Sequence, residues 1–250
     1  MGSQAAVRSN PEDSGKDFRA QISGFVLAGG RSGRMGEDKV LLPWPGQDLN
    51  KGTLLDHAVA RLKHVCATVS ICANREFPGR GETVIPDARA GCGPLGGIVA
   101  ALEQSATEWN IFLAVDLPFL PVEALEAQVA RVYRAEEGPI VADNSSLQQI
   151  ACVIPQLDGR PQPLCGLYRR SLASGLRHAL EKSTFKVITA LQEALIHSIR
   201  DRQGNLSLRI DLWDASDFAA KMNPAQDPTE WFLNVNTPED WRRARQLRLR

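Results

Sequence analysis

Short, almost wholly apolar runs recur along the chain and alternate with segments of helical periodicity. Strands that are buried on both faces of a sheet have this pattern, because neither row of side chains faces water. The apolar runs predict strands at residues 22–27, 68–73, 83–86, 110–115 and 139–142. Such strands belong to a sheet that is covered on both sides.

The segments between these runs predict helices. Thr53 can cap a helix that ends near residue 64. Pro94 and Pro121 can each occupy the first turn of a further helix, ending near residues 105 and 134. Strands that alternate with helices predict an α/β fold of three layers (α/β/α), with helices on both faces of a mostly parallel sheet.

The second half of the chain is less regular. Residues 161–170 predict a strand that leads into a helix over residues 171–182, and residues 183–195 predict another short helix. We expect an antiparallel strand in this half. Residues 200–230 are an insert of unknown role that contains a strand-like run. Residues 231–236 then predict a last apolar strand before the C-terminal helix.

Composition and charge define the class of protein. The chain has 250 residues, of which 43% are hydrophobic and 23% charged, and its 29 basic residues balance 29 acidic ones. A chain of this length can bury a core large enough for one α/β domain. We therefore expect a single domain over residues 21–250 behind a flexible leader over residues 1–20. The zero net charge excludes a general nucleic-acid coat.

The sequence shows no membrane or secretory segment. No run reaches the roughly 18 apolar residues that a membrane helix needs, and the amino-terminal segment lacks the apolar core of a signal peptide. We therefore expect a cytoplasmic protein with neither a membrane nor a nucleic acid as partner. The five cysteines include no C-x-x-C pair, so we expect reduced, mostly buried thiols.

The most informative segment is the glycine-rich stretch LAGGRSGRMGEDK, residues 27–39, which follows the first strand. Glycine lets phosphate oxygens approach the backbone and permits the positive φ angles of an amide nest. Arg34 and Lys39 add full charges, so the segment predicts a phosphate-binding loop. Its spacing matches neither a Walker A loop nor a dinucleotide fingerprint. A flexible turn with solvated side chains is the alternative.

An aspartate ends the fourth strand. The run FLAVDLP places Asp116 at the carboxyl edge of the sheet, where open α/β sheets bind ligands. A carboxylate repels polyphosphate, so we expect Mg²⁺ between the two, held by one or two protein oxygens and by phosphate. Asp116 is the expected ligand, and Asn234 or Asn236 can supply a second oxygen. Alternatively, Asp116 caps the helix at Pro121 and the asparagines form turns.

A second glycine-rich loop surrounds Asp87 and precedes the helix at Pro94. It suits close approach of the backbone to a ligand at a helix start. Asn74 follows the second strand, where its amide can read a base or ribose edge or can form a turn. The glycines of this loop are Gly91, Gly93, Gly96 and Gly97.

Six segments in order resemble those of the molybdenum cofactor guanylyltransferases, a family of nucleoside triphosphate transferases with a Rossmann-like fold. They are LAGGRSGRMGEDK, ANR, PDARAGCGPLGGI, AVDLPFLP, PQPLCGLYRR and FLNVNTPED. The resemblance covers residues 22–242. It implies transfer of GMP from GTP to the terminal phosphate of molybdopterin carrying molybdenum, with release of pyrophosphate. The letters LAGG, rather than LAAG, favour guanylyl over cytidylyl members.

The resemblance also implies roles for individual residues. It places Asp116 as the Mg²⁺ ligand, with Asn236 as a second metal ligand. GTP and molybdopterin are the implied substrates, and transient contact with a molybdenum insertase or a molybdoenzyme chaperone is expected. The implied nucleotide-binding residues are Leu27, Ala28, Gly29, Gly30, Lys39, Asn74, Asp87 and Asp116.

The expected chemistry needs no side-chain base, because a phosphate monoester is already mostly dianionic near neutral pH. We expect the metal to bridge the α- and β-phosphates while Arg34 and Lys39 stabilise the leaving pyrophosphate. The four histidines fall in expected helices away from strand ends, so none is expected to act. Two alternatives stay open: a cytidylyltransferase acting on molybdopterin or another small acceptor, and a catalytically silent GTP-binding sensor.

Overall fold

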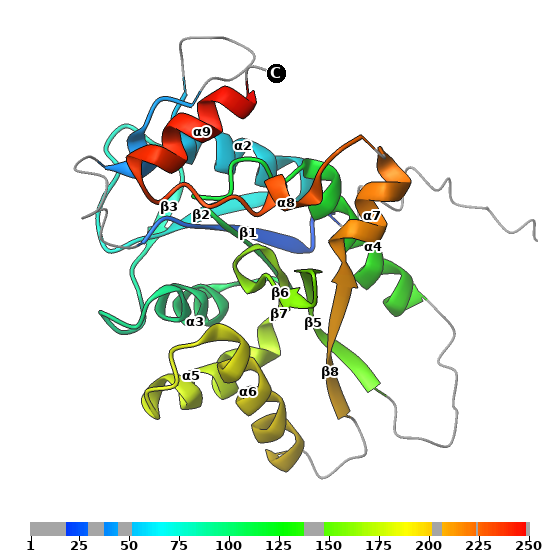
Figure 1. The fold of residues 1–250 in the computed structure, drawn as a ribbon. Helices are drawn as coiled ribbons and strands as arrows, with labels where there is room; N and C mark the ends of the chain where they lie inside the picture. Colours follow the sequence, from blue (N-terminus) through cyan, green and yellow to red (C-terminus); the bar gives the residue numbers. More distant parts are fainter. Residues whose placement is uncertain are drawn as a thin grey trace, which may run out of the picture.

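The structure of the protein is a computed structural model that describes residues 19–29, 38–44, 52–137, 148–201, 207–223 and 225–248. The described strands form one sheet in the order β3-β2-β1-β4-β7-β5-β6, and β8 pairs with β5 (Figure 1). Helices cover both faces of this sheet. The expected α/β/α architecture is therefore confirmed.

Parallel strands form the half of the sheet that positions the site. Every residue of β1 and β4 is buried, because each strand has a neighbour on either side and helices above and below. Leu27 lies opposite Cys72 on one side and Ala114 on the other, so the carboxyl ends of three strands meet at one edge. These strands are β1 (Ile22–Leu27), β2 (Thr68–Cys72), β3 (Thr83–Ile85) and β4 (Trp109–Ala114).

The other half of the sheet is mixed. β7 (Leu167–Arg169) runs antiparallel to β4, and β5 (Gln148–Leu157) runs antiparallel to β7. β8 (Ser207–Asp214) is parallel to β5, and the two-residue β6 (Arg160–Pro161) forms a hairpin with β5. β7 confirms the antiparallel strand that was expected in the second half.

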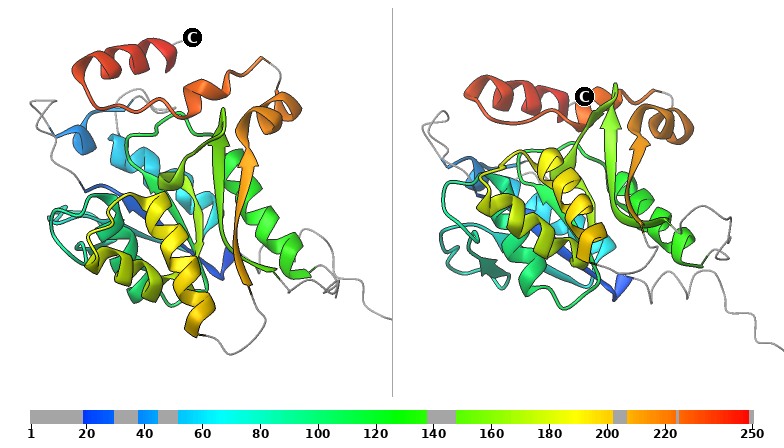
Figure 2. Two further views of the ribbon diagram at one scale, coloured as in Figure 1. Left: turned by 60° about the horizontal axis from the view of Figure 1, so that its bottom comes forward. Right: turned by 90° about the horizontal axis from the view of Figure 1, so that it is seen from below.

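The helices form two layers (Figure 1, Figure 2). One face of the sheet is covered by α2 (Leu54–Val65) and α4 (Val122–Glu137), and along this side lie α7 (Ala215–Met222), α8 (Pro228–Trp231) and α9 (Pro238–Arg248). The other face is covered by α3 (Pro94–Gln104), α5 (Ala173–Glu181) and α6 (Val187–Asp201). Within the described residues, no helix combines the length and apolarity that crossing a membrane requires.

The helix that begins after Thr53 shows why the local prediction succeeds. The Thr53 hydroxyl accepts from the Asp56 N–H at 3.2 Å, and the Asp56 carboxylate accepts from the Thr53 N–H at 2.7 Å. This capping box satisfies donors that the first helical turn would otherwise leave free. The helix then buries an apolar face that includes Leu54, Leu55 and Leu62.

The predicted strand at residues 231–236 is wrong. α8 ends at Trp231, and the rest of the segment is irregular. Phe232 and Val235 are buried in the core, and the Val235 N–H donates to the Asp116 carbonyl at 3.0 Å. Packing of apolar residues and the Val235 hydrogen bond to Asp116 thus anchor this segment, rather than a strand ladder.

The second half of the chain differs from the sequence prediction in other elements as well. β5 was not predicted, because three glutamines and Pro155 interrupt its apolar pattern. The expected strand at residues 161–170 contains the last residue of β6, the 3₁₀ turn η2 (Pro163–Cys165) and only then β7, because proline cannot donate to a ladder. The insert supplies β8 and α7. The predicted strand at residues 139–142 and residues 1–18 of the leader expected over residues 1–20 lie outside the described residues.

Candidate active site at the carboxyl edge of the sheet

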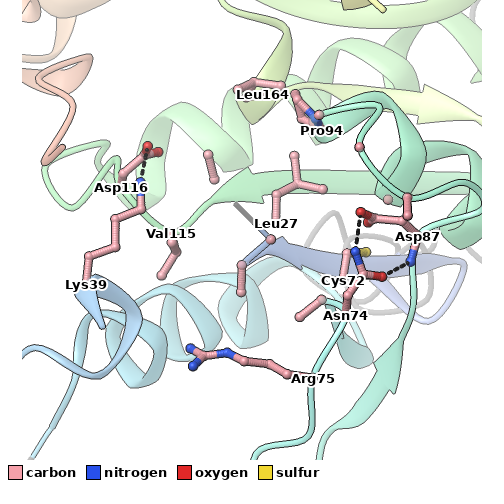
Figure 3. A pocket seen from close by; sticks show the side chains of 18 residues that line it. Leu27, Lys39, Cys72, Asn74, Arg75, Asp87, Pro94, Val115, Asp116 and Leu164 are labelled. Atoms are coloured by element: carbon pink, nitrogen blue, oxygen red, sulfur yellow. Dashed lines mark hydrogen bonds and ion pairs between the residues drawn. The ribbon is translucent and has the colours of Figure 1, made fainter. Parts of the chain in front are cut away.

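A cavity of about 680 Å³ lies at the carboxyl ends of β1, β2 and β4 (Figure 3). Its volume is in the range of small-molecule sites, and its position is where α/β sheets bind ligands. Of the predicted site residues, Asn236 lies beside the cavity through its contact with Lys39, whereas Gly30 and Arg34 lie outside the described residues. The predicted residues that line the cavity are Leu27, Ala28, Gly29, Lys39, Asn74, Asp87 and Asp116.

A lysine joins three distant parts of the chain at one wall. Lys39 belongs to the 3₁₀ turn η1 (Lys39–Leu41), which Asp38 caps. Its Nζ lies 3.0 Å from Asp116 Oδ2 and 2.9 Å from Asn236 Oδ1. The Lys39 and Asp116 side chains are each only 16% exposed, so solvent screens this ion pair less than a surface pair. Sequence reasoning named all three residues, and the structure brings them together.

The backbone fixes Asp116 at this wall. The Val115 N–H donates to the Leu27 carbonyl at 3.1 Å, and the Asp116 carbonyl accepts from Val235 at 3.0 Å. The side chain uses Oδ2 for Lys39, whereas Oδ1 is buried and has no hydrogen-bond partner among the described residues. A buried carboxylate oxygen without a partner is unusual and calls for a ligand or a cation.

The residues at this wall fit a magnesium ion. Mg²⁺ in nucleotide sites is held by one or two protein oxygens, with substrate phosphates and water completing its shell. Asp116 Oδ1 has no hydrogen-bond partner among the described residues. The Asn236 amide oxygen lies close to Asp116, because it and Asp116 Oδ2 both accept from the Lys39 ammonium. Among the described residues, no three His, Cys, Asp or Glu side chains form a closed metal site. The arrangement therefore suits an ion that arrives with phosphate.

Two residues of α2 hold the loop behind Asp116, and neither was predicted. The Arg61 guanidinium donates to the Leu120 carbonyl at 2.5 Å and to the Leu117 carbonyl at 2.8 Å. His57 Nε2 lies 2.9 Å from the Pro118 carbonyl and must carry the hydrogen, since a carbonyl only accepts. Three backbone carbonyl groups of one loop are thus fixed from one helix. The sequence signal that could have indicated this role is an arginine four residues after a histidine, both on the apolar face of the predicted helix.

This contact corrects the expectation that every histidine lies away from the strand ends. Burial, with a smaller contribution from the Arg61 charge, lowers the pKa of His57 to about 4. The ring is therefore neutral near pH 7 and serves as a hydrogen-bond donor rather than as a base. Burial also lowers the pKa of Arg61, to about 9, which leaves its guanidinium charged at neutral pH.

The opposite wall is built around Asp87. The Asn74 amide donates to Asp87 Oδ2 at 2.7 Å and accepts from the Asp87 N–H at 2.8 Å, so the two side chains form a closed pair (Figure 3). Position 97 favours glycine, because a Cβ there would lie 3.2 Å from Asp87 Oδ1 and would push against it. Gly93 adopts φ +61° and ψ −154°, which leads the chain into α3.

The start of α3 faces this cavity. Gly93 and Pro94 line it, and no side chain caps the first turn. Pro94 has no N–H and the Gly96 N–H donates to the Gly93 carbonyl at 3.2 Å, so the positive end of the helix dipole is what favours an anion here. Arg75 also lines the cavity, forms an ion pair with Asp38 and lies 4.7 Å from the centre of the Phe77 ring. Sequence reasoning did not select Arg75, although it follows Asn74 directly.

The cysteines take no part in this chemistry. All five are free and buried, as expected. Cys72 lines the cavity, but burial and the nearby Asp87 charge raise its thiol pKa far above the usual range. Burial raises the pKa of Cys66 to about 12. A thiol that stays protonated is a poor nucleophile.

Comparison with known proteins gives a consistent result. Residues 24–197 match the model of the MobA-like NTP transferase domain family. The chain is 32% identical to a molybdenum cofactor guanylyltransferase of Nitrobacter hamburgensis, over 90% of this chain and 93% of that protein. It is 33% identical to one of Rhizobium johnstonii, over 89% and 90%.

A solved structure shares the fold. Molybdopterin-guanine dinucleotide biosynthesis protein A of Archaeoglobus fulgidus superposes with a TM-score of 0.61. Its sequence is 22% identical, and the match covers 90% of this chain and 97% of that one. At this identity the likeness supports the arrangement of strands and helices.

Proposed function

This chain belongs to the MobA-like NTP transferase family, and from that premise we propose that it transfers GMP from GTP to the terminal phosphate of molybdopterin carrying molybdenum. The products are molybdopterin guanine dinucleotide and pyrophosphate. One observation carries the proposal. The Lys39 ammonium joins Asp116 and Asn236 at the wall of a nucleotide-sized cavity, with a free carboxylate oxygen beside it.

The reaction is a substitution at the α-phosphorus of GTP. An oxygen of the acceptor phosphate forms the new bond to phosphorus, and the bond between that phosphorus and the bridging oxygen to the β-phosphate breaks. The electron pair leaves with pyrophosphate. Because the acceptor phosphate is already mostly dianionic near neutral pH, no side chain has to remove a proton. The neutral His57 and the raised thiol pKa of Cys72, the cysteine that lines the cavity, agree with this.

The task of the protein is to bring two anions together and to hold them in line. In this proposal the positive N-terminal end of α3 and the Lys39 ammonium attract phosphate oxygens, and Arg34 of the glycine-rich loop adds a further charge. Asn74 and Asp87 line the part of the site that receives the nucleoside. Arg61 and His57 keep Asp116 in place through the loop that follows it.

Magnesium belongs to this proposal as well. Asp116 Oδ1 would hold it, with the Asn236 amide oxygen as a second protein ligand. When bound, the ion neutralises phosphate charge and favours departure of pyrophosphate. The cytoplasmic location and the transient contacts with a molybdenum insertase or a molybdoenzyme chaperone stay predictions.

The test is incubation of the protein with Mg²⁺ and molybdopterin carrying molybdenum, together with either GTP or CTP. We expect dinucleotide product and pyrophosphate with GTP, and far less with CTP, because a pocket that pairs with guanine leaves its polar groups unpaired against cytosine. Dinucleotide product formed with CTP but not with GTP would identify a cytidylyltransferase. GTP binding with no product, given an authentic acceptor, would identify a sensor.

A further inference from the structure

The turn η1, which carries Lys39, is fixed to the body of the protein on the side that follows Lys39. Val40 is buried in the core. The Leu42 carbonyl accepts from the Leu54 N–H at 3.0 Å, which ties the end of the turn to the start of α2. On the side that precedes Lys39, the described chain begins at Asp38. The contacts of Asp38 therefore determine where the start of the turn lies.

Asp38 uses its two carboxylate oxygens for two different contacts. Oδ1 accepts from the Val40 N–H at 3.3 Å and so caps the turn. Oδ2 is buried, and its partner among the described residues is the Arg75 guanidinium, with which it forms an ion pair. Figure 3 shows the Arg75 side chain extending from the end of β2 toward the side of the cavity where Lys39 lies. The ion pair thus joins the strand end to the turn.

Arg75 is itself held in place from both sides. Before it, Asn74 is fixed by its two hydrogen bonds with Asp87. After it, Phe77 is buried, and the Arg75 guanidinium lies over the Phe77 ring, 4.7 Å from its centre. A guanidinium that stacks on an aromatic ring is restricted in orientation, which favours a defined ion pair. Arg75 can therefore serve as a fixed point for Asp38.

We propose that Arg75 is a positioning residue for Lys39. Through Asp38 it fixes the start of η1, so that the Lys39 ammonium stays within reach of Asp116 and of a bound triphosphate. Its charge also neutralises the Asp38 carboxylate, which would otherwise repel phosphate beside Lys39. The inference rests on the proposed function, because it assumes a triphosphate at this wall. The Arg75 side chain is 44% exposed, and such an ion pair adds little to stability, so its effect should appear in nucleotide binding.

A double-mutant cycle separates this role from direct contact with the nucleotide. Asp38→Asn keeps the side-chain oxygen that caps η1 but removes the charge that pairs with Arg75. In calorimetric titrations with GTP and Mg²⁺, Arg75→Ala should raise the Kd about tenfold in the wild-type background and less than about twofold in the Asp38→Asn background, where the pair is already lost. An equal loss in both backgrounds would show that Arg75 binds the nucleotide itself and would overturn the proposal. An unchanged Kd in the wild-type background would overturn it too.

Arg131→Ala is the matched control. Arg131 forms an ion pair with Asp211, its side chain is 39% exposed against 44% for Arg75, and it does not line the cavity. This variant should bind GTP like wild type, and in urea unfolding Arg75→Ala should lose no more free energy than Arg131→Ala does. If Arg131→Ala weakens GTP binding as much as Arg75→Ala, the effect is a general loss of positive charge and the inference fails.

Chemical labelling of Lys39 without nucleotide separates this inference from the proposed function. Trinitrobenzenesulfonate reacts with accessible amines, and the Lys39 side chain is only 16% exposed. In Arg75→Ala, mass spectrometry should show Lys39 labelled at least about threefold faster than in wild type, because the turn opens more often. The exposed Lys182 serves as the internal standard. If Lys39 is labelled at the same rate in both proteins, the inference fails. If labelling rises as expected but wild type transfers no GMP to molybdopterin carrying molybdenum, the proposed function fails and the positioning role stands.

Discussion

Replacement of His57 by glutamine tests the packing that supports Asp116. The glutamine amide can still donate to the Pro118 carbonyl, but it does not titrate. His57 has a pKa of about 4 in the folded protein against an ordinary value of 6.5. A histidine whose pKa is lower in the folded than in the unfolded protein stabilises the fold fully above about pH 6.5. This stability is lost as the pH falls towards about 4.

The size of the effect follows from that difference. At 1.36 kcal/mol for each pH unit, the full contribution of His57 is about 3 kcal/mol, and about 2 kcal/mol of it is lost between pH 7.5 and pH 5. Protonation would place a second positive charge beside the buried Arg61, which makes only carbonyl contacts among its described hydrogen bonds. The hydrogen bond to Pro118 survives protonation, so the cost comes from burial and from this repulsion.

The assay is urea unfolding at pH 7.5 and pH 5. Wild type should lose about 2 kcal/mol more unfolding free energy across this interval than His57→Gln does. His64→Gln is the control, since His64 is exposed on the same helix, and this variant should follow wild type. If His57→Gln and wild type lose the same free energy, the ring is not buried neutral against the loop, and the account of how Asp116 is held would be refuted.

Three further predictions concern the site and the packing around it. Asp116→Ala should abolish turnover without unfolding the protein, and near-normal Mg²⁺-dependent activity would remove Asp116 from the mechanism. Lys39→Ala should remove about 2 to 4 kcal/mol of transition-state stabilisation and lower kcat/KM accordingly. An unchanged kcat/KM would argue against the role of Lys39. Gly175→Ala should lower the free energy of unfolding by about 1 to 3 kcal/mol, because its Cβ would lie 2.7 Å from Ala194 Cα. Gly81→Ala, which meets nothing within 4 Å, should cost far less in the same urea titration.

The parallel half of the fold was predictable because its signals are local. β1 and β4 are apolar along their whole length, and the helix after Thr53 carries its own capping box. The mixed half depends on long-range pairing. β5 is held by β7 and β8, so its glutamines and its proline are tolerated in a strand that its own sequence does not specify.

The site shows the same division. Lys39, Asp116 and Asn236 stand at loop and strand-end positions whose residue types are informative, so sequence reasoning selected them. Their mutual contacts are not local: Lys39 and Asn236 are 197 residues apart along the chain. Arg61 looked like an ordinary helical residue, because its burial depends on a loop that begins 56 residues later.

The most direct test of the central claim is a crystal structure with GTP and Mg²⁺. We predict that the triphosphate lies in the cavity between Asp116 and the first turn of α3, with Lys39 on a phosphate oxygen and the metal on Asp116. A triphosphate bound elsewhere, with the Lys39 to Asp116 ion pair unchanged, would contradict the account.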